Sequence, residues 1–169
     1  MNGRIFTIGH GTWTLDGMVE MLRRNGVSHL IDIRSSPYSA HQPEFARREL
    51  EKLADRKGYV YVYMGEQLGG RPNQADCYTE SKVDYAKLRQ KDFFKRGIAR
   101  LLESQQQGLT VCLLCAEGQP TECHRTLLVG RALTDAGVLV EHFLPNGSVQ
   151  TQAQVLVEPP TAQISLPLS

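Results

Sequence analysis

The residues with the clearest chemical potential lie in one short segment, residues 115–125, with the sequence Cys-Ala-Glu-Gly-Gln-Pro-Thr-Glu-Cys-His-Arg. The segment follows the apolar run 109–114 and precedes a predicted helix, so it stands where a buried strand reaches the surface. Thiols, carboxylates, imidazoles and guanidinium groups serve proteins as nucleophiles, proton carriers and anion ligands. Their concentration here predicts a functional site.

Cys115 is the better candidate nucleophile of the two cysteines in this segment. It ends the predicted strand, close to a helix N-terminus and to basic residues that would favour its thiolate. The alternative is that Cys115 is a small apolar side chain that completes a buried strand. Cys112 lies within the apolar run and is expected in the core, whereas Cys77 lies in a long loop and is expected to be exposed.

Two glutamates are candidates for proton transfer. Glu117 lies within the segment, and Glu66 follows a different predicted strand. If the fold brings them together, they form an acid/base pair around a hydrolytic water.

Two histidines are candidates to assist catalysis. His124 lies in the segment, and His10 is flanked by Gly9 and Gly11. Glycines on both sides of a histidine indicate a close approach of another group to the backbone, which we expect to be the substrate. The alternative for His10 is a structural histidine that hydrogen-bonds a local carbonyl group.

Arginines near the predicted site suit an anionic substrate, because guanidinium groups bind phosphates and carboxylates through paired hydrogen bonds. Arg34, Arg71 and Arg125 are the candidates. Asp32 either lies at the substrate, where it could serve as a catalytic acid, or forms an internal ion pair that positions Arg34. Thr121 is the predicted N-cap of the following helix, whose first turn would favour a bound anion.

No metal site is assigned from the sequence, and no cofactor is identified. A zinc site built from His10, Cys115, Cys123 and His124 would lack the Cys-x2-Cys type of spacing. The interval from Cys115 to Arg125 is also longer than that of the Cys-x5-Arg loop of cysteine phosphatases, which disfavours an enzyme of that class.

Hydrophobic periodicity predicts strands that alternate with helices along the chain. The predicted strands are residues 4–9, 27–33, 59–63, 109–114 and 138–143, and the predicted helices are residues 15–24, 43–57, 84–107 and 121–136. Such alternation favours an α/β fold, specifically a Rossmann-like three-layer sandwich with a mostly parallel five-stranded sheet. The long connection between residues 64 and 83 is typical of a binding loop or lid.

The strand order 3-2-1-4-5 is expected, which makes the first and fourth strands neighbours. Sites in such sheets form at the carboxyl ends of the strands. His10, Asp32, Glu66 and Cys115 all follow strand ends, so we expect them at one edge.

Length and composition indicate one soluble domain, residues 1–145, followed by a tail, residues 146–169, that is either disordered or adds a strand near residues 155–157. The formal net charge of +1 does not indicate any class of binding partner. No apolar run approaches the roughly 20 residues of a membrane span, which favours a cytoplasmic protein without a membrane partner. The sequence is compatible with a homo-oligomer.

Four parts of the chain resemble one family of bacterial and archaeal proteins, the domain of unknown function 488 family. These parts are residues 7–11, 32–37, 66–71 and 115–125, and the resemblance covers residues 4–145. The most specific part is the pattern Cys-x-Glu-x-x-Pro-x-x-Cys-His-Arg. The resemblance implies a shared fold and site position, and any link to nucleic acid metabolism is an association.

The leading hypothesis is an enzyme that acts on an anionic nucleotide or nucleic-acid-derived substrate by hydrolytic or group-transfer chemistry. The rivals are a non-catalytic module that binds nucleotides or nucleic acid and a thiol- or metal-dependent sensor. The predicted helix 84–107 is rich in lysine and arginine, which suits nucleic acid, although a solvated helix face is the favoured explanation.

Overall fold

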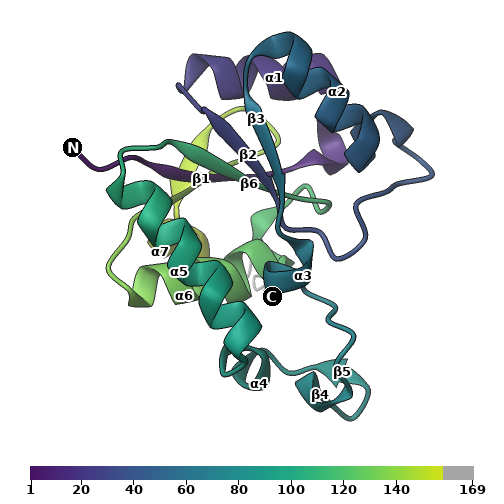
Figure 1. Ribbon diagram of the computed structural model, residues 1–169, viewed down its shortest axis with the longest axis vertical. Helices are drawn as coiled ribbons and strands as arrows, with labels where there is room; N and C mark the ends of the chain where they lie inside the picture. Colours follow the sequence, from purple (N-terminus) through teal and green to yellow (C-terminus); the bar gives the residue numbers. More distant parts are fainter. Residues whose placement is uncertain (158–169) are drawn as a thin grey trace, which may run out of the picture.

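The computed structural model describes residues 1–157 and contains a six-stranded, mostly parallel sheet with helices on both faces (Figure 1). From one edge to the other the strands are β3 (Val60–Tyr63), β2 (His29–Asp32), β6 (Val111–Cys115), β1 (Ile5–Gly9), β7 (Val140–Phe143) and β8 (Val149–Thr151). Only the β7–β8 pair is antiparallel within this sheet. The predicted Rossmann-like α/β class is therefore confirmed.

The strand count and order differ from the prediction. The fourth predicted strand, β6, lies between β2 and β1, so the first five strands follow the order 3-2-4-1-5 and β8 adds a sixth. Strands β1 and β6 are both mainly apolar and are buried along their whole length. Burial on both faces marks a strand as central. Burial on both faces does not distinguish which of the two central strands, β1 or β6, lies next to β2. The predicted strand order was wrong for this reason.

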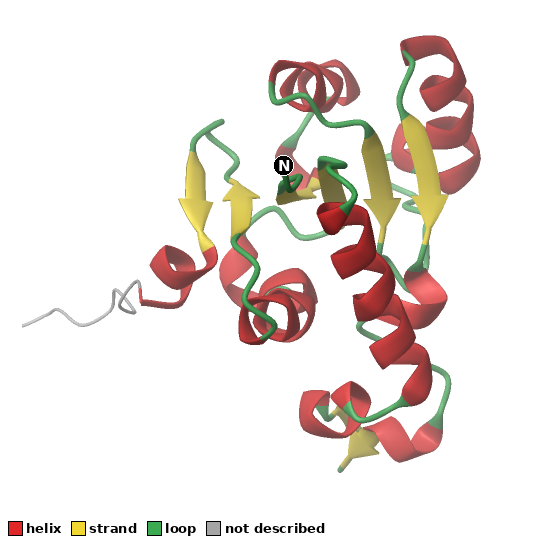
Figure 2. Cartoon of the chain, turned by 60° about the vertical axis from the view of Figure 1, so that its left-hand side comes forward, coloured by secondary structure: helices red, strands yellow, loops and turns green. Residues whose placement is uncertain are grey.

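Helices cover the sheet in two layers, as Figure 2 shows from the side. The helices are α1 (Leu15–Arg24), α2 (Arg47–Lys57), α3 (Gly65–Leu68), α4 (Tyr85–Arg89), α5 (Asp92–Gln106), α6 (Arg131–Asp135) and α7 (Gln152–Val157). Residues of α1 and α2 share one core cluster with Cys112 and Leu114 of β6, whereas residues of α5 and α6 share the other with Leu113 and Cys115. Successive side chains of a strand point to opposite faces. Cys115 therefore points toward the layer of α5 and α6.

Two predicted helices differ from those in the structure. The predicted helix 84–107 is divided into α4 and α5, because Lys91 has extended backbone angles. The predicted helix 121–136 starts later, since Cys123 is also extended and Thr121 lies in a short 3-10 turn, Pro120–Glu122. A π-helical stretch, Arg125–Gly130, then leads into α6. The prediction that Thr121 caps this helix was wrong.

The connection between β3 and α4 contains local structure of its own. After α3 it forms a 3-10 turn, Ala75–Cys77, and a short hairpin of β4 (Tyr78–Thr79) and β5 (Lys82–Val83). Two further 3-10 turns are His10–Thr12 and Pro43–Phe45. Cys77 is fully buried, so the expectation of an exposed cysteine in this connection was wrong.

The ordered structure continues past residue 145, where the predicted domain ends. Residues 149–157 form β8 and α7, and Gln152 of α7 is buried against the domain. Its amide donates a hydrogen bond of 2.9 Å to the Thr126 carbonyl, and its side-chain oxygen accepts one of 2.7 Å from His142 Nε2. The rest of the predicted tail, residues 158–169, lies outside the described residues.

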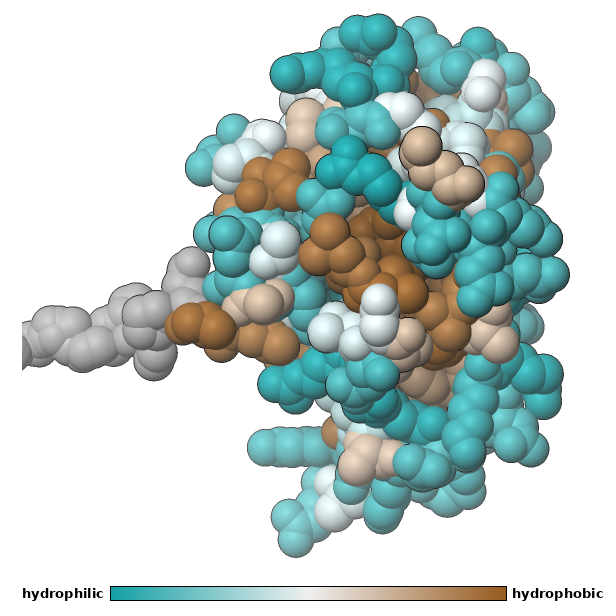
Figure 3. All heavy atoms as spheres, turned by 90° about the vertical axis from the view of Figure 1, so that its left-hand side faces the viewer, coloured by the Kyte–Doolittle hydropathy of each residue, from teal (hydrophilic) through white to brown (hydrophobic). Residues whose placement is uncertain are grey.

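The surface in Figure 3 carries hydrophobic side chains near the middle of one face, with hydrophilic side chains around them. Within residues 1–157, no helix combines the length and the apolar character that crossing a bilayer requires.

The buried His142 makes stability depend on pH. Burial lowers its pKa to about 4, whereas in the unfolded chain the imidazole titrates near 6.5. The unfolded chain therefore takes up a proton between these pH values that the native protein does not, and stability falls as the pH drops from 6.5 to 4. We expect a loss of roughly 3 kcal/mol from this group, at about 1.4 kcal/mol per pKa unit.

This prediction is tested by urea unfolding of the wild type and His142→Gln at pH 7 and pH 4. The carboxyl groups titrate in both proteins and their effect cancels. The difference in the free energy of unfolding between the wild type and His142→Gln should therefore be smaller at pH 4 than at pH 7 by roughly 3 kcal/mol. An advantage that is the same at both pH values would contradict the prediction.

Candidate functional site

Three neighbouring parallel strands end at the same edge of the sheet and bring the candidate residues together. Gly9, the last residue of β1, is in register with Cys115, the last residue of β6. On the other side of β6, Asp32 of β2 is in register with Leu114. The expected meeting of the first and fourth predicted strands at the site is thus observed, although the complete strand order differs.

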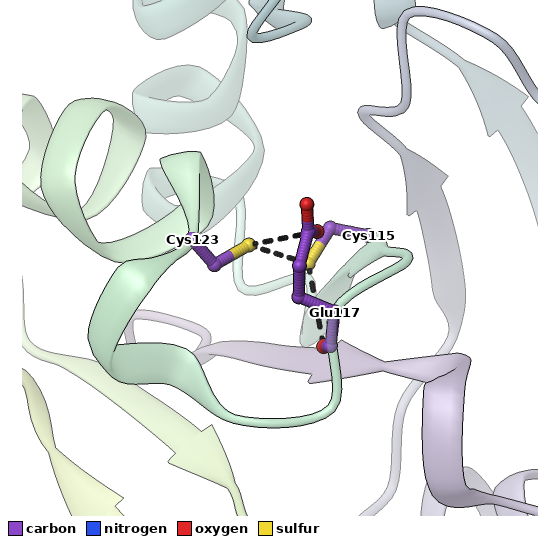
Figure 4. Close-up of side chains that lie close together, drawn as sticks. All are labelled: Cys115, Glu117 and Cys123. Carbon is purple, nitrogen blue, oxygen red and sulfur yellow. Dashed lines mark hydrogen bonds between the residues drawn. The ribbon is translucent and has the colours of Figure 1, made fainter.

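Two cysteines and a glutamate form the centre of this edge, shown in Figure 4. The Sγ atoms of Cys115 and Cys123 are 2.7 Å apart, and Cys123 Sγ lies 3.5 Å from Glu117 Oε2. Both thiols are buried, whereas Glu117 is exposed. The segment that stood out in the sequence folds back on itself, so that residues eight positions apart are in contact.

The backbone around Cys123 explains how this contact arises. The turn at Pro120–Glu122 reverses the chain, and extended angles at Cys123 direct its side chain back toward β6. The backbone N–H of Arg125, at the start of the π-helical stretch, donates to Cys123 Sγ over 3.4 Å. His124 donates through Nε2 to the Ile33 carbonyl at 2.9 Å, which leaves Nδ1 at 4.0 Å from Cys123 Sγ.

The two thiols differ strongly in acidity. A hydrogen bond from the Cys115 thiol lowers the pKa of Cys123 to about 6. Burial raises the pKa of Cys115 well above its ordinary value. Burial alone would lower the pKa of His124, but the contact with Cys123 raises it. These directions favour Cys123 as the thiolate, in place of the Cys115 expected from the sequence.

Arg125 lies beneath the loop that carries Glu117. Its side chain is fully buried and donates from Nη2 to the Gly118 carbonyl at 2.9 Å. Its Nε and Nη1 atoms have no hydrogen-bond partner among the described residues, and no carboxylate pairs with it there. Arg125 was expected to bind substrate directly; it instead places a buried positive charge behind the cysteines.

Gly9 and Gly11 face the protein's own backbone. A Cβ atom on Gly9 would lie 1.5 Å from the Glu117 carbonyl oxygen, and one on Gly11 would lie 2.9 Å from the Ala116 carbonyl oxygen. The N–H of Gly11 donates to that Ala116 oxygen at 2.9 Å. A close approach was predicted correctly from the glycines, but the approaching group is the loop 116–118, and their expected contact with substrate is not seen.

Asp32 and Arg34 form a buried ion pair. Arg34 Nε and Nη2 donate to the two carboxylate oxygens at 2.8 and 2.7 Å, and Nη2 also donates to the Phe45 carbonyl. Tyr61 donates a further hydrogen bond to Asp32. The donors of Arg34 are thus engaged inside the protein, which favours the internal ion pair over direct anion binding.

His10 joins this ion pair to a loop residue that the sequence did not single out. Arg34 Nη1 donates to His10 Nε2 at 3.3 Å, and His10 Nδ1 donates to Gln42 Oε1 at 2.9 Å. The Gln42 amide lies 3.3 Å from the carbonyl oxygen of His10, to which it donates. Burial lowers the pKa of His10, so this histidine is neutral near pH 7. Its fixed position suits a structural role as well as a catalytic one.

Glu66 and Arg71 lie outside the central cluster. Glu66 is exposed on α3 and is not part of the group formed by Cys115, Glu117 and Cys123, so its pairing with Glu117 around a water stays a prediction. Arg71 is exposed, and its backbone N–H donates to Ser35 Oγ at 2.8 Å.

Tyr85, at the start of α4, is a neighbour of the site that sequence analysis missed. Its ring is half-buried, and its hydroxyl group is close enough to feel the charges of Cys123, Glu117 and Arg71. Burial is the main cause that raises its pKa. A tyrosine at the start of a predicted helix gave no signal that separated it from a core aromatic residue.

The predicted nucleic-acid surface, the basic helix 84–107, has less support than the cysteine segment. Two of the basic residues in the predicted helix 84–107 pair with local acids, Arg89 with Asp135 at 2.8 Å and Lys91 with Asp76.

A groove of about 500 Å³ between α5 and α6 is lined by apolar residues such as Phe94, Ile98 and Leu102, and includes none of the candidate site residues.

Comparison with known protein families identifies the family of this chain. The sequence model of the family described as "Domain of unknown function DUF488" matches residues 14–132, well over half of the chain. The chain belongs to this family. The DUF488 match includes residues 115–125 and begins after Gly9–Gly11. No curated protein and no solved structure was found to match the chain.

The contact between the two thiols predicts a specific response to mild oxidation by diamide. Each Cys115–Cys123 pair should lose two protons and two electrons to diamide and form one intramolecular disulfide, because the sulphur atoms already touch. The number of titratable thiols in the unfolded protein should fall from four to two.

The assignment is checked with two variants. Cys112→Ala should still form the bond, and Cys115→Ala should not. Loss of thiols from the Cys115→Ala protein at the wild-type rate would contradict the observed geometry.

Proposed function

We propose that this chain is an enzyme that carries out hydrolytic or group-transfer chemistry on an anionic substrate, with Cys123 as the reactive sulphur. The observation that supports this most is the surroundings of Cys123 Sγ. The sulphur lies 2.7 Å from the Cys115 thiol, 3.5 Å from a Glu117 carboxylate oxygen and 3.4 Å from the backbone N–H of Arg125. A proton acceptor and two donors thus surround one nucleophilic atom.

This arrangement supports a reaction in two steps. In the first, the Cys123 thiolate bonds to the electrophilic phosphorus or carbon, and the leaving oxygen departs with the bonding electron pair and takes a proton from solvent. In the second, the Glu117 carboxylate accepts a proton from a water molecule while the water oxygen displaces the sulphur, which leaves as the thiolate, and Glu117 then returns that proton to solvent. The products are the alcohol and the free acid, and the enzyme is unchanged.

The proposed substrate is a nucleotide or a nucleic-acid-derived anion. Arg71 supports this choice, because its guanidinium group is exposed near the site, whereas Arg34 and Arg125 are buried. Tyr85 supplies an aromatic ring close to Arg71. A guanidinium group suits a phosphate, and an aromatic face suits a base.

The proposal is tested by incubating the protein with nucleoside mono-, di- and triphosphates and separating the products by chromatography. Cys123→Ser should lower kcat/KM by at least about 100-fold, and Glu117→Gln should lower it by about 10²- to 10⁴-fold, as removal of an acid/base group does. Arg71→Ala should mainly raise KM. Cys77→Ala, which removes a buried thiol outside the site, should retain activity.

Mass spectrometry of the rapidly quenched reaction should show the transferred group on the fragment that contains Cys123. Wild-type turnover by Cys123→Ser, or conversion of none of the nucleotides by the wild type, would overturn the proposal.

A further inference from the structure

We propose that Cys115, Cys123 and Glu117 form a binding site for a thiophilic divalent cation of the Zn²⁺ type, with one coordination position open to solvent. The three side chains each offer one ligand atom, and these atoms all lie within 4.8 Å of one another. Figure 4 shows them converging from the end of β6, the following loop and the turn before the π-helical stretch. Two sulphur ligands and one carboxylate suit zinc.

The site is close to the required geometry. Zinc–sulphur bonds of about 2.3 Å in a tetrahedral site place two sulphur atoms about 3.8 Å apart. The observed separation is 2.7 Å, so the thiols need to open by about 1 Å. Glu117 is exposed and adjoins Gly118, and its side chain can follow a bound ion. Because Glu117 is exposed, we place the open fourth position on its solvent side, as in sites that bind a water or a substrate.

The charges of the surrounding residues also favour a bound cation. Two thiolates, one carboxylate and a divalent ion carry a net charge of −1. Arg125 supplies a compensating positive charge, since its buried guanidinium group has no acidic partner among residues 1–157 and keeps two nitrogen atoms without a hydrogen bond. A buried charge without a counter-charge is costly. The loaded site would keep a single negative charge beside Arg125, which balances the guanidinium group.

Neighbouring groups are placed to support the sulphur ligands. The Arg125 backbone N–H points at Cys123 Sγ, and His124 is fixed by its hydrogen bond to the Ile33 carbonyl. Such outer contacts orient ligands and stabilise their ionised forms. The ligands come from a strand end and a turn, so the sequence lacks the short cysteine spacing of structural zinc motifs.

A bound cation would hold Cys123 as a ligand and prevent its attack on a substrate. This regulatory consequence rests on the proposed function, whereas the cation site itself does not. The metal-free protein would be the active form, and the loaded protein the protected form.

The experiment is a titration of the reduced, metal-free full-length protein with Co²⁺, followed by absorbance. We expect one Co²⁺ per chain with an intense near-ultraviolet sulphur-to-metal band, and loss of the band when Zn²⁺ displaces Co²⁺. Cys115→Ser and Cys123→Ser should each weaken the band and raise the Kd at least tenfold. Glu117→Gln should raise the Kd while the sulphur band remains, and Glu66→Gln, a change at an exposed glutamate outside the cluster, should match the wild type.

Failure to bind one Co²⁺ per chain, or a band that Cys123→Ser leaves unchanged, would overturn the cation site. If the metal-free protein then converts nucleotides in a Cys123-dependent manner, only the cation site is wrong. If Co²⁺ binds as described but Cys123→Ser retains wild-type turnover, the cation site is supported and the proposed function is wrong. Circular dichroism of each variant separates these results from loss of folding.

Discussion

The contact between the end of β1 and the loop 116–118 is the constraint on which the site depends. Gly9 and Gly11 have no side chains, and the carbonyl groups of Glu117 and Ala116 occupy the space that a Cβ atom would fill. The chain therefore leaves β6 tightly against its neighbouring strand and turns back at Pro120, which brings Cys123 to Cys115. The arrangement of the cysteines thus depends on backbone packing more than on the cysteines themselves.

The charged groups at this edge are divided into two sets with different roles. Asp32 and Arg34 neutralise each other and hold His10 in place, so this set is internally satisfied. Cys115, Cys123 and Glu117, in contrast, are groups that all become negative on ionisation, with the unpaired charge of Arg125 behind them. A cluster of acidic groups beside a buried cation is an arrangement in which ionisation or ligand binding is favoured. The first set holds its residues in place, and the second is the one to which we assign the proposed chemistry.

The fold class and the meeting of Gly9, Asp32 and Cys115 at one edge of the sheet were predictable, because both follow from periodicity and from the rule that parallel strands end at one edge. The order of β1 and β6 was not, since two fully buried strands have the same pattern. The contributions of Gln42, Tyr61 and Tyr85 could not be predicted either, because the path of a loop or of a separate helix decides which side chains reach the site. The wrong helix start at Thr121 had a local cause: a good capping residue was followed by an extended Cys123.

The short sequence separation of Cys115 and Cys123 has a consequence for the unfolded chain. Closing a loop of eight residues costs little entropy, so the two sulphur atoms have a high effective concentration before any sheet exists. A reagent or ion that needs only the two sulphurs therefore recognises the unfolded chain as well and gives limited stabilisation. Selectivity for the folded protein has to come from groups that only the tertiary structure brings near, namely the Arg125 charge and the loop that packs on Gly9.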